Sequence, residues 1–180
     1  MMFEKIFFLA SAAAGLFALY MAVRNILFIH RNSLRPFVIN GPKVSVLIPA
    51  RNEEQTIGPC LDSLLNQSYV NYEIIVLDDL SSDNTWEILS SYESAHNSIS
   101  IVRGKPLPEG WYGKNHALHQ LAAEAGGEIF LFTDSDTKHK KTSVSFAVTN
   151  LEYHNVDFLS GYPRQKFSIK SIGPVLSLLF

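Results

Sequence analysis

The sequence is poor in the residues that several common kinds of site require. Its 180 residues include one cysteine, Cys60, so neither an internal disulfide nor a cysteine-rich zinc site can form within the chain. Cys60 falls in an expected helix, where we predict a plain buried thiol. The formal net charge is −2, which gives no indication of general nucleic-acid binding. The phosphate-binding loops G-x-x-x-x-G-K-[ST] and G-x-G-x-x-G are absent from the sequence.

Charge is missing from one long stretch near the N-terminus, Ile6 to Val23. As a helix, these residues would be about 27 Å long, close to the thickness of the hydrocarbon core of a bilayer. We therefore expect residues 1–30 to form a transmembrane anchor. A cleaved signal peptide would have a basic start and a shorter apolar stretch, whereas here Glu4 cancels Lys5. A core helix of a soluble protein is the remaining alternative.

The charges beside this segment predict its orientation. Only Lys5 precedes it, and the positive charges that follow it are Arg24, Arg31, Arg35 and Lys43. Because positive charge favours the cytoplasmic side, we expect an anchor in the cell membrane with the downstream domain in the cytoplasm. Residues 31–43 contain two prolines and one glycine without helical periodicity, which indicates a linker.

After the linker, short β-branched apolar segments alternate with segments of helical periodicity. This alternation predicts an α/β domain with a mostly parallel sheet and helices on both faces. Ser82 or Asp83 is the expected N-cap of the second helix. Strands are expected at 44–48, 72–77, 99–102 and 128–132, helices at 55–66, 84–95, 114–125 and 142–153, and a further extended, strand-like segment at 156–159.

Polar residues cluster at the expected carboxyl ends of the strands, where open α/β sheets bind their ligands. The clusters are Pro49-Ala50-Arg51-Asn52-Glu53-Glu54, Asp78-Asp79 and Asp134-Ser135-Asp136, and Lys114 opens the helix before the last of them. Each motif alone also fits an ordinary role. Asp78-Asp79 suits a turn or a cap, and a lysine at a helix start is often simply solvated.

Together, these motifs predict a site for a nucleotide diphosphate. Asp134 and Asp136, one residue apart after a buried strand, form a compact oxygen site. Such a site suits Mg²⁺ or Mn²⁺ with waters and substrate phosphates as further ligands. Lys114 at a helix N-terminus adds a second anion-binding element. Asp78 and Asp79 can accept hydrogen bonds from a base or ribose.

Four stretches carry a family resemblance: VSVLIPARNEEQTIGPCLDSLLNQSY, YEIIVLDDLSSDNT, GKNHAL and EIFLFTDSDT. They make the region from about Val44 to Tyr162 similar to the family 2 glycosyltransferases of the GT-A fold. PLPEGWYGKNHAL, followed by DFLSGYPRQ, resembles the branch associated with hopanoid and carotenoid glycosylation, which typically carries membrane helices. The resemblance implies inverting, metal-dependent transfer of a sugar from a nucleotide-sugar donor to a lipid or other membrane-associated acceptor.

The resemblance also implies roles for particular residues. Pro49, Ala50 and Glu53 would line the nucleotide pocket, and Arg51 is expected at its rim. Asp78 or Asp79 would contact the base or ribose, and Lys114 would lie near the diphosphate or base. Asp134 and Asp136 would form the metal motif beside the donor, with Asp136 the stronger candidate for a direct ligand.

The chain ends in an almost wholly apolar run, Ile172 to Phe180. We interpret residues 44–180 as a GT-A nucleotide-sugar-binding domain truncated at its C-terminus. The family's catalytic base lies well beyond the metal motif, so we expect it beyond Phe180, and Asp157 follows Asp136 too closely to serve. Two alternatives stay open: a nucleotide-sugar-binding module without catalysis, and a sugar nucleotidylyltransferase, whose G-x-G-T-R opening is missing here.

The orientation of the anchor can be tested with reporter fusions made after Pro42. We expect the signal of a cytoplasmic reporter, because the positive charges gather after the apolar segment. A fusion that is active only on the opposite side of the membrane would show that the orientation is wrong.

Overall fold

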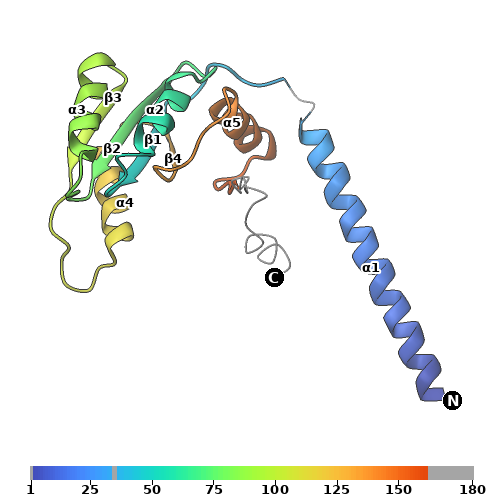
Figure 1. The fold of residues 1–180 in the computed structure, drawn as a ribbon. Coiled ribbons are helices and arrows are strands. Elements are labelled where there is room, and N and C mark those ends of the chain that lie inside the picture. Colours follow the sequence, from blue (N-terminus) through green and yellow to red (C-terminus); the bar gives the residue numbers. More distant parts are fainter. Residues whose placement is uncertain (1, 34–35, 162–180) are drawn as a thin grey trace. The chain divides into compact units, whose positions relative to one another are not determined.

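The computed structural model describes residues 2–33 and 36–161, in two units that are considered separately (Figure 1). The first unit contains α1, Met2–Ser33, a single long helix. Within it, Lys5–Phe28 is long and apolar enough to cross a membrane, by length and composition alone. The helix includes the first three residues of the expected linker, 31–33. The apolar run Ile172–Phe180 lies outside the described residues.

The second unit is built on a sheet whose strands all run parallel. In the described part of the chain the strand order is β3-β2-β1-β4. Each of the two central strands has four buried β-branched or leucine residues, which explains why they lie inside the sheet, whereas the edge strand before Asp134, expected to be buried, alternates half-buried and exposed residues. The strands are β1 Val44–Ala50, β2 Tyr72–Asp78, β3 Ile99–Arg103 and β4 Ile129–Phe132, and the helices of this unit are α2 Ile57–Leu65, α3 Thr85–Ala95, α4 Gly113–Glu124 and α5 Ser143–His154.

Helices cover both faces of this sheet (Figure 1). On one face, Ala117 and Leu121 of α4 pack against Leu47 of β1 and against Ile75 and Leu77 of β2. On the other face lie α2 and α3, which contact each other. This arrangement follows from right-handed crossovers: β1 to β2 and β2 to β3 step in one direction along the sheet, whereas β3 to β4 steps back. The expected α/β class with a parallel sheet is confirmed.

The structure corrects the sequence-based prediction at the start of α3. The N-cap of α3 is Asn84 rather than Ser82 or Asp83. The Asp83 carboxylate nevertheless accepts the backbone N–H of Thr85 at 3.0 Å, so it satisfies an amide of the first turn from one position earlier. At the C-terminal end of α5, Asn155 adopts the left-handed conformation, with φ of 48°.

The extended segment expected at Val156–Leu159 forms no strand in the described structure. The backbone N–H of Val156 bonds back to the carbonyl of Leu151, so the segment begins as the turn that closes α5. A strand also requires a ladder partner, and the described residues provide none for this segment. Phe158 accordingly remains 82% exposed.

The amino end of the sheet is fixed by a polar cluster around Glu73. Its carboxylate pairs with Lys43 and accepts hydrogen bonds from the Ser45 hydroxyl at 2.6 Å and the Gly126 amide at 2.9 Å. Ser45 Oγ in turn accepts the Gly127 amide at 2.9 Å. This cluster holds the turn before β4 against β1, which sets the parallel register of the two strands.

Gly127 is predicted to be intolerant of a side chain. A Cβ there would lie 2.7 Å from backbone atoms of Lys43 and Ser45, whereas one on Gly126 would approach only flexible side-chain atoms, at 3.3 Å or more. Gly127→Ala should therefore lower the free energy of unfolding by about 1–3 kcal/mol through overpacking. Gly126→Ala is the matched control and should lower it less. Denaturant unfolding of the two variants makes the comparison, and equal stabilities would contradict the packing described here.

Candidate functional site

The candidate site lies at the carboxyl edge of the sheet, where the strand ends gather. Ala50 and Asp78 are register partners at the ends of β1 and β2, and both are buried. The Asp79 amide donates to the Ala50 carbonyl at 2.8 Å. Next to them, the Thr133 amide that follows β4 donates to the carbonyl of Leu47 at 3.1 Å. Parallel pairing thus places the segments after β1, β2 and β4 along one edge.

Lys114 and Asp134 meet at this edge. Lys114 is the second residue of α4, and its Nζ lies 2.6 Å from Asp134 Oδ1. Both side chains are more than half exposed, so the ion pair is accessible to a ligand. The two residues also line one shallow open pocket, whose other lining residues are Pro49, Leu118, Phe132 and Thr133. Three predicted site residues, Pro49, Lys114 and Asp134, are thereby brought together.

The Asp134–Asp136 segment contacts α2. Ser135 is buried between the two exposed aspartates, and the Cys60 thiol lies 3.8 Å from the Asp134 carbonyl oxygen. Burial, followed by the nearby charge of Asp136, raises the pKa of Cys60 to about 12. Cys60 is therefore the protonated, buried thiol expected from the sequence, and it is not available as a thiolate ligand.

His139 supports the same segment from its other end. Its Nε2 lies 3.0 Å from the Thr133 hydroxyl, and its amide donates to Ser63 Oγ of α2 at 2.9 Å. Burial lowers the pKa of His139, which favours the neutral ring. The loop that carries the two carboxylates is thus fixed to the fold by uncharged contacts, and both aspartates are exposed.

The two carboxylates fit a metal ion that shares its coordination with a substrate. Among the described residues, no group of three or more His, Cys, Asp or Glu side chains could hold a metal ion. Asp134 and Asp136 would therefore supply at most two protein ligands. That number suits Mg²⁺ or Mn²⁺, which commonly bind one or two carboxylates and take the rest of their ligands from water and phosphate.

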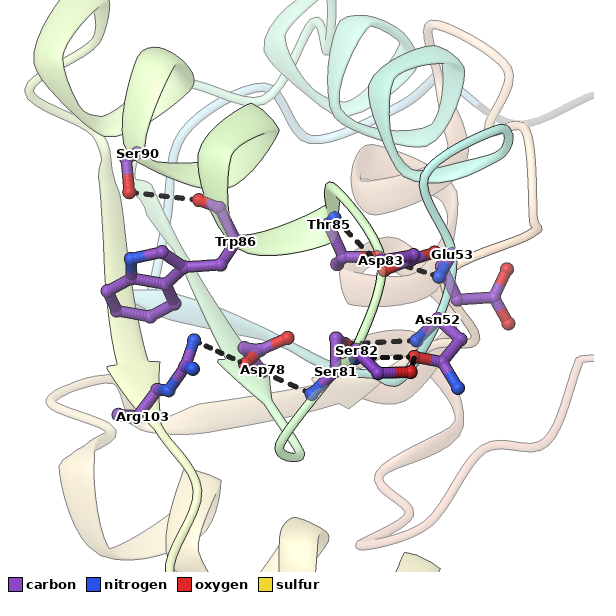
Figure 2. Close-up of polar contacts among 10 residues, drawn as sticks. All are labelled: Asn52, Glu53, Asp78, Ser81, Ser82, Asp83, Thr85, Trp86, Ser90 and Arg103. Atoms are coloured by element: carbon purple, nitrogen blue, oxygen red, sulfur yellow. Dashed lines mark hydrogen bonds and ion pairs between the residues drawn. The ribbon is translucent and has the colours of Figure 1, made fainter.

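Asp78 is the most unusual carboxylate of the edge. Its side chain is fully buried, and Oδ2 accepts from Arg103 Nη1 at 2.9 Å (Figure 2). The Arg103 guanidinium also lies over the Trp86 ring, 4.4 Å from its centroid. No donor among the described residues reaches Asp78 Oδ1. A buried carboxylate oxygen without a partner is costly, so Asp78 Oδ1 is an unusual feature of this edge.

Sequence reasoning missed Arg103 and Trp86. Neither belongs to a recognisable motif, and Arg103 simply ends the third strand. The signal that could have identified it is register: β3 pairs with β2 so that Arg103 is the partner of Asp78. Sequence reasoning also left Asp78 and Asp79 equivalent. In the structure, Asp79 turns toward Arg51 instead, at 3.6 Å, and the Arg51 side chain is 64% exposed at the rim.

Hydrogen bonds lock the loops after β1 and β2 together (Figure 2). The Asn52 amide donates to Ser81 Oγ at 3.0 Å, and Asn52 Oδ1 accepts the Ser82 amide at 2.8 Å. The Glu53 amide donates to Thr85 Oγ1 at 2.8 Å, while the Glu53 carboxylate accepts the Thr56 hydroxyl. The contacts of Glu53 are thus with its own loop and with α3, so in the structure it fixes the loop after β1 to the start of α3.

Comparisons with a family model and with individual proteins indicate the same family. The model of glycosyl transferase family 2 matches residues 45–170. A probable glycosyltransferase YdaM of Bacillus subtilis is 39% identical over 112 residues, covering 61% of this chain and 26% of that protein. The 4,4'-diaponeurosporenoate glycosyltransferase of Staphylococcus aureus is 34% identical over 122 residues, covering 66% of this chain and 31% of that protein. The chain thus spans less than a third of the length of these relatives.

Solved structures resemble the same region. S. aureus TarS 1-349 in complex with UDP-GlcNAc matches with a TM-score of 0.52 and 30% identity, over 68% of this chain and 37% of that one. The mannosyltransferase PcManGT from Pyrobaculum calidifontis, in complex with GDP-Man and Mn²⁺, matches with a TM-score of 0.56 and 25% identity, over 77% of this chain and 43% of that one. The expected GT-A-like fold is therefore confirmed.

The environment of Cys60 predicts a very unreactive thiol. With its pKa raised to about 12, the thiolate fraction at neutral pH falls about a thousandfold from that of an ordinary cysteine. Alkylation of the folded chain should therefore be slow, and denaturant should accelerate it sharply because unfolding exposes the thiol. Cys60 is the only thiol of the chain, so all alkylation reports on this site. Mass spectrometry of chain treated with iodoacetamide measures both rates. Rapid alkylation without denaturant would contradict the packing of α2 beneath the Asp134–Asp136 segment.

Proposed function

The chain belongs to glycosyl transferase family 2, and on that premise we propose that it is the donor-binding part of an inverting, metal-dependent glycosyltransferase. The sugar passes from a nucleotide-diphosphate donor to a lipid or other membrane-associated acceptor. The observation that carries this proposal is the 2.6 Å contact between Lys114 and Asp134. It joins the N-terminus of α4, an anion-binding element, to the carboxylates expected to hold a metal.

Asp134 and Asp136 are the residues that would hold Mg²⁺ or Mn²⁺, and the mannosyltransferase structure with GDP-Man and Mn²⁺ supports this assignment by similarity. The chemistry that such an ion supplies is stabilisation of the negative charge that develops on the departing diphosphate. Lys114 acts beside it: its ammonium group and the N-terminal amides of α4 face the same anionic group. In the absence of donor, Lys114 forms an ion pair with Asp134. Donor binding would therefore replace the Asp134 carboxylate by the diphosphate as the partner of Lys114.

Asp78 and Arg103 would orient the nucleoside. The family resemblance implies that Asp78 contacts the base or ribose. Its side chain is fully buried, so the groups that a ligand can reach here are the donors of Arg103 at the half-exposed rim. Pro49, Ala50 and Glu53 would line the nucleotide pocket after β1, as the family resemblance implies, and Pro49 lines the pocket beside Lys114 and Asp134. We place the base that deprotonates the acceptor outside the described residues, as the family resemblance implies.

Two observations bear on the acceptor and the location. The 4,4'-diaponeurosporenoate glycosyltransferase, by its name, acts on that compound, and Lys5–Phe28 could cross a membrane. Together they support a membrane-associated acceptor and a single anchor in the cell membrane. The positive charges that follow the apolar segment favour a domain on the cytoplasmic side. A nucleotide-sugar-binding module without catalysis is the second candidate.

Nucleotide diphosphate binding should depend on the metal and on Asp136. In calorimetric titrations of the chain, we expect binding with Mn²⁺ and little or none in chelator. Asp136→Ala should weaken binding about ten- to a hundredfold, because a lost contact to a charged group is typically worth about 1.5–3 kcal/mol.

The matched control for this experiment is Asp157→Ala, an exposed aspartate after α5. It removes the same charge from a position that we assign outside the site, so affinity should change little. Equal affinity in chelator and in Mn²⁺, together with an Asp136→Ala variant that binds like the wild type, would contradict the proposed function.

A further inference from the structure

The connection between β3 and α4, residues 104–112, carries an exposed apolar surface that the donor site does not use. We call it the Trp111 loop. Leu107 is 53% exposed, Trp111 42% and Tyr112 81%. Exposed apolar side chains scattered singly are ordinary, but here three large ones occur within six residues of one loop. In Figure 1 this loop projects away from the sheet before the chain returns into α4.

The Trp111 loop has defined internal and external contacts. The Trp111 amide donates to the Pro108 carbonyl at 3.3 Å, which closes a turn with Gly110 at φ of 82°, the positive value required at the third position of a type II turn. At its start, the Lys105 amide donates to Gln120 Oε1 of α4 at 2.9 Å.

Trp111 is held against α4 from the side. Its ring lies 5.5 Å from the ring of His116 and 5.1 Å from that of His119. These contacts fix one side of the indole and leave the remainder exposed. The fold therefore holds the apolar side chains outward, and they have not collapsed onto the domain.

The composition of the loop fits one kind of partner, the interfacial region of a lipid bilayer. Tryptophan and tyrosine concentrate at that depth, because each has an apolar ring and a polar group that stays in contact with water. Lys105 and Glu109 leave the loop without net charge, so its affinity for the interface comes from its aromatic and apolar side chains.

The chain itself supplies the proximity that such docking needs. Ten residues, 34–43, separate the end of α1 from the start of β1. Even fully extended, such a segment reaches only about 35 Å. A domain of this size is roughly as wide as that reach. If α1 spans a bilayer, the domain remains at its surface, and weak interfacial contacts suffice to orient it.

We propose that the Trp111 loop docks into the headgroup region of the membrane that α1 anchors. This inference rests on the membrane attachment in the proposed function. Tyr112 is the N-cap of α4, and Lys114 follows two residues later. Docking of the loop therefore brings the Lys114–Asp134 contact to the membrane surface. The acceptor class that this geometry selects is a lipid whose reactive hydroxyl lies at the depth of the headgroups.

The two tryptophans of the chain make a direct test possible. They are Trp86 in α3 and Trp111 in the loop, and α1 contains none. The full chain is reconstituted into vesicles of phosphatidylcholine and phosphatidylglycerol, with or without bromine atoms high on the acyl chains. Trp86→Phe leaves Trp111 as the only indole, and Trp111→Phe is the matched control that leaves Trp86. The wild type carries both, so either single-indole signal can also be obtained by difference.

Brominated lipid should reduce the emission of Trp111 by roughly half or more, as expected for an indole at the interface, and leave that of Trp86 nearly unchanged. Leu107→Asp should reduce the quenching of Trp111. If the chain floats with the vesicles but both indoles are quenched equally weakly, the chain is anchored and the proposed docking of the loop is wrong. The exposed loop is then available to a protein partner. A chain that does not float contradicts both. Nucleotide titrations in detergent report on the donor site separately.

Discussion

Parallel pairing of β1 with both β2 and β4 is the constraint on which the candidate site depends. It places the segments after the three strands along one edge, so that Ala50 and Asp78 are register partners and Pro49 and Asp134 line one pocket although they are far apart in sequence. The pairing is fixed at the opposite end by Glu73, Ser45 and Gly127, where the turn before β4 is too tight to admit a side chain. Packing at one end of the sheet thus determines the chemistry at the other.

At the carboxyl edge, the carboxylates differ in what surrounds them. Asp134 and Asp136 are exposed and sit on a loop that Cys60 and His139 support without charge. Asp78 is buried, and Arg103 satisfies only one of its oxygens. This difference suits a divided role: exposed carboxylates can share an ion with a phosphate, whereas a buried one in a fixed position can select a hydrogen-bond donor.

The sequence predicted much of this arrangement because its strands are short, apolar and bounded by turn residues. The expected strands lie within about two residues of the observed ones, and Lys114 and Asp134 meet as their positions implied. Val156–Leu159 was misjudged, because β-branched and apolar residues suggest a strand whether or not a partner exists. Arg103 and Trp86 could not be found from periodicity. Arg103 meets Asp78 only because of the register of β3, and Trp86 joins them through its cation–π contact with Arg103.

The central claim is that the two aspartates of one loop and the phosphates of a donor share one metal ion. Pulsed electron paramagnetic resonance of Mn²⁺ with the chain and a nucleotide diphosphate tests it most directly. The account predicts coupling of Mn²⁺ to phosphorus from the nucleotide and, in the same complex, to carbon-13 in labelled aspartate carboxylates. Phosphorus coupling with no aspartate coupling would mean that the ion belongs to the nucleotide alone, and this result would contradict the account.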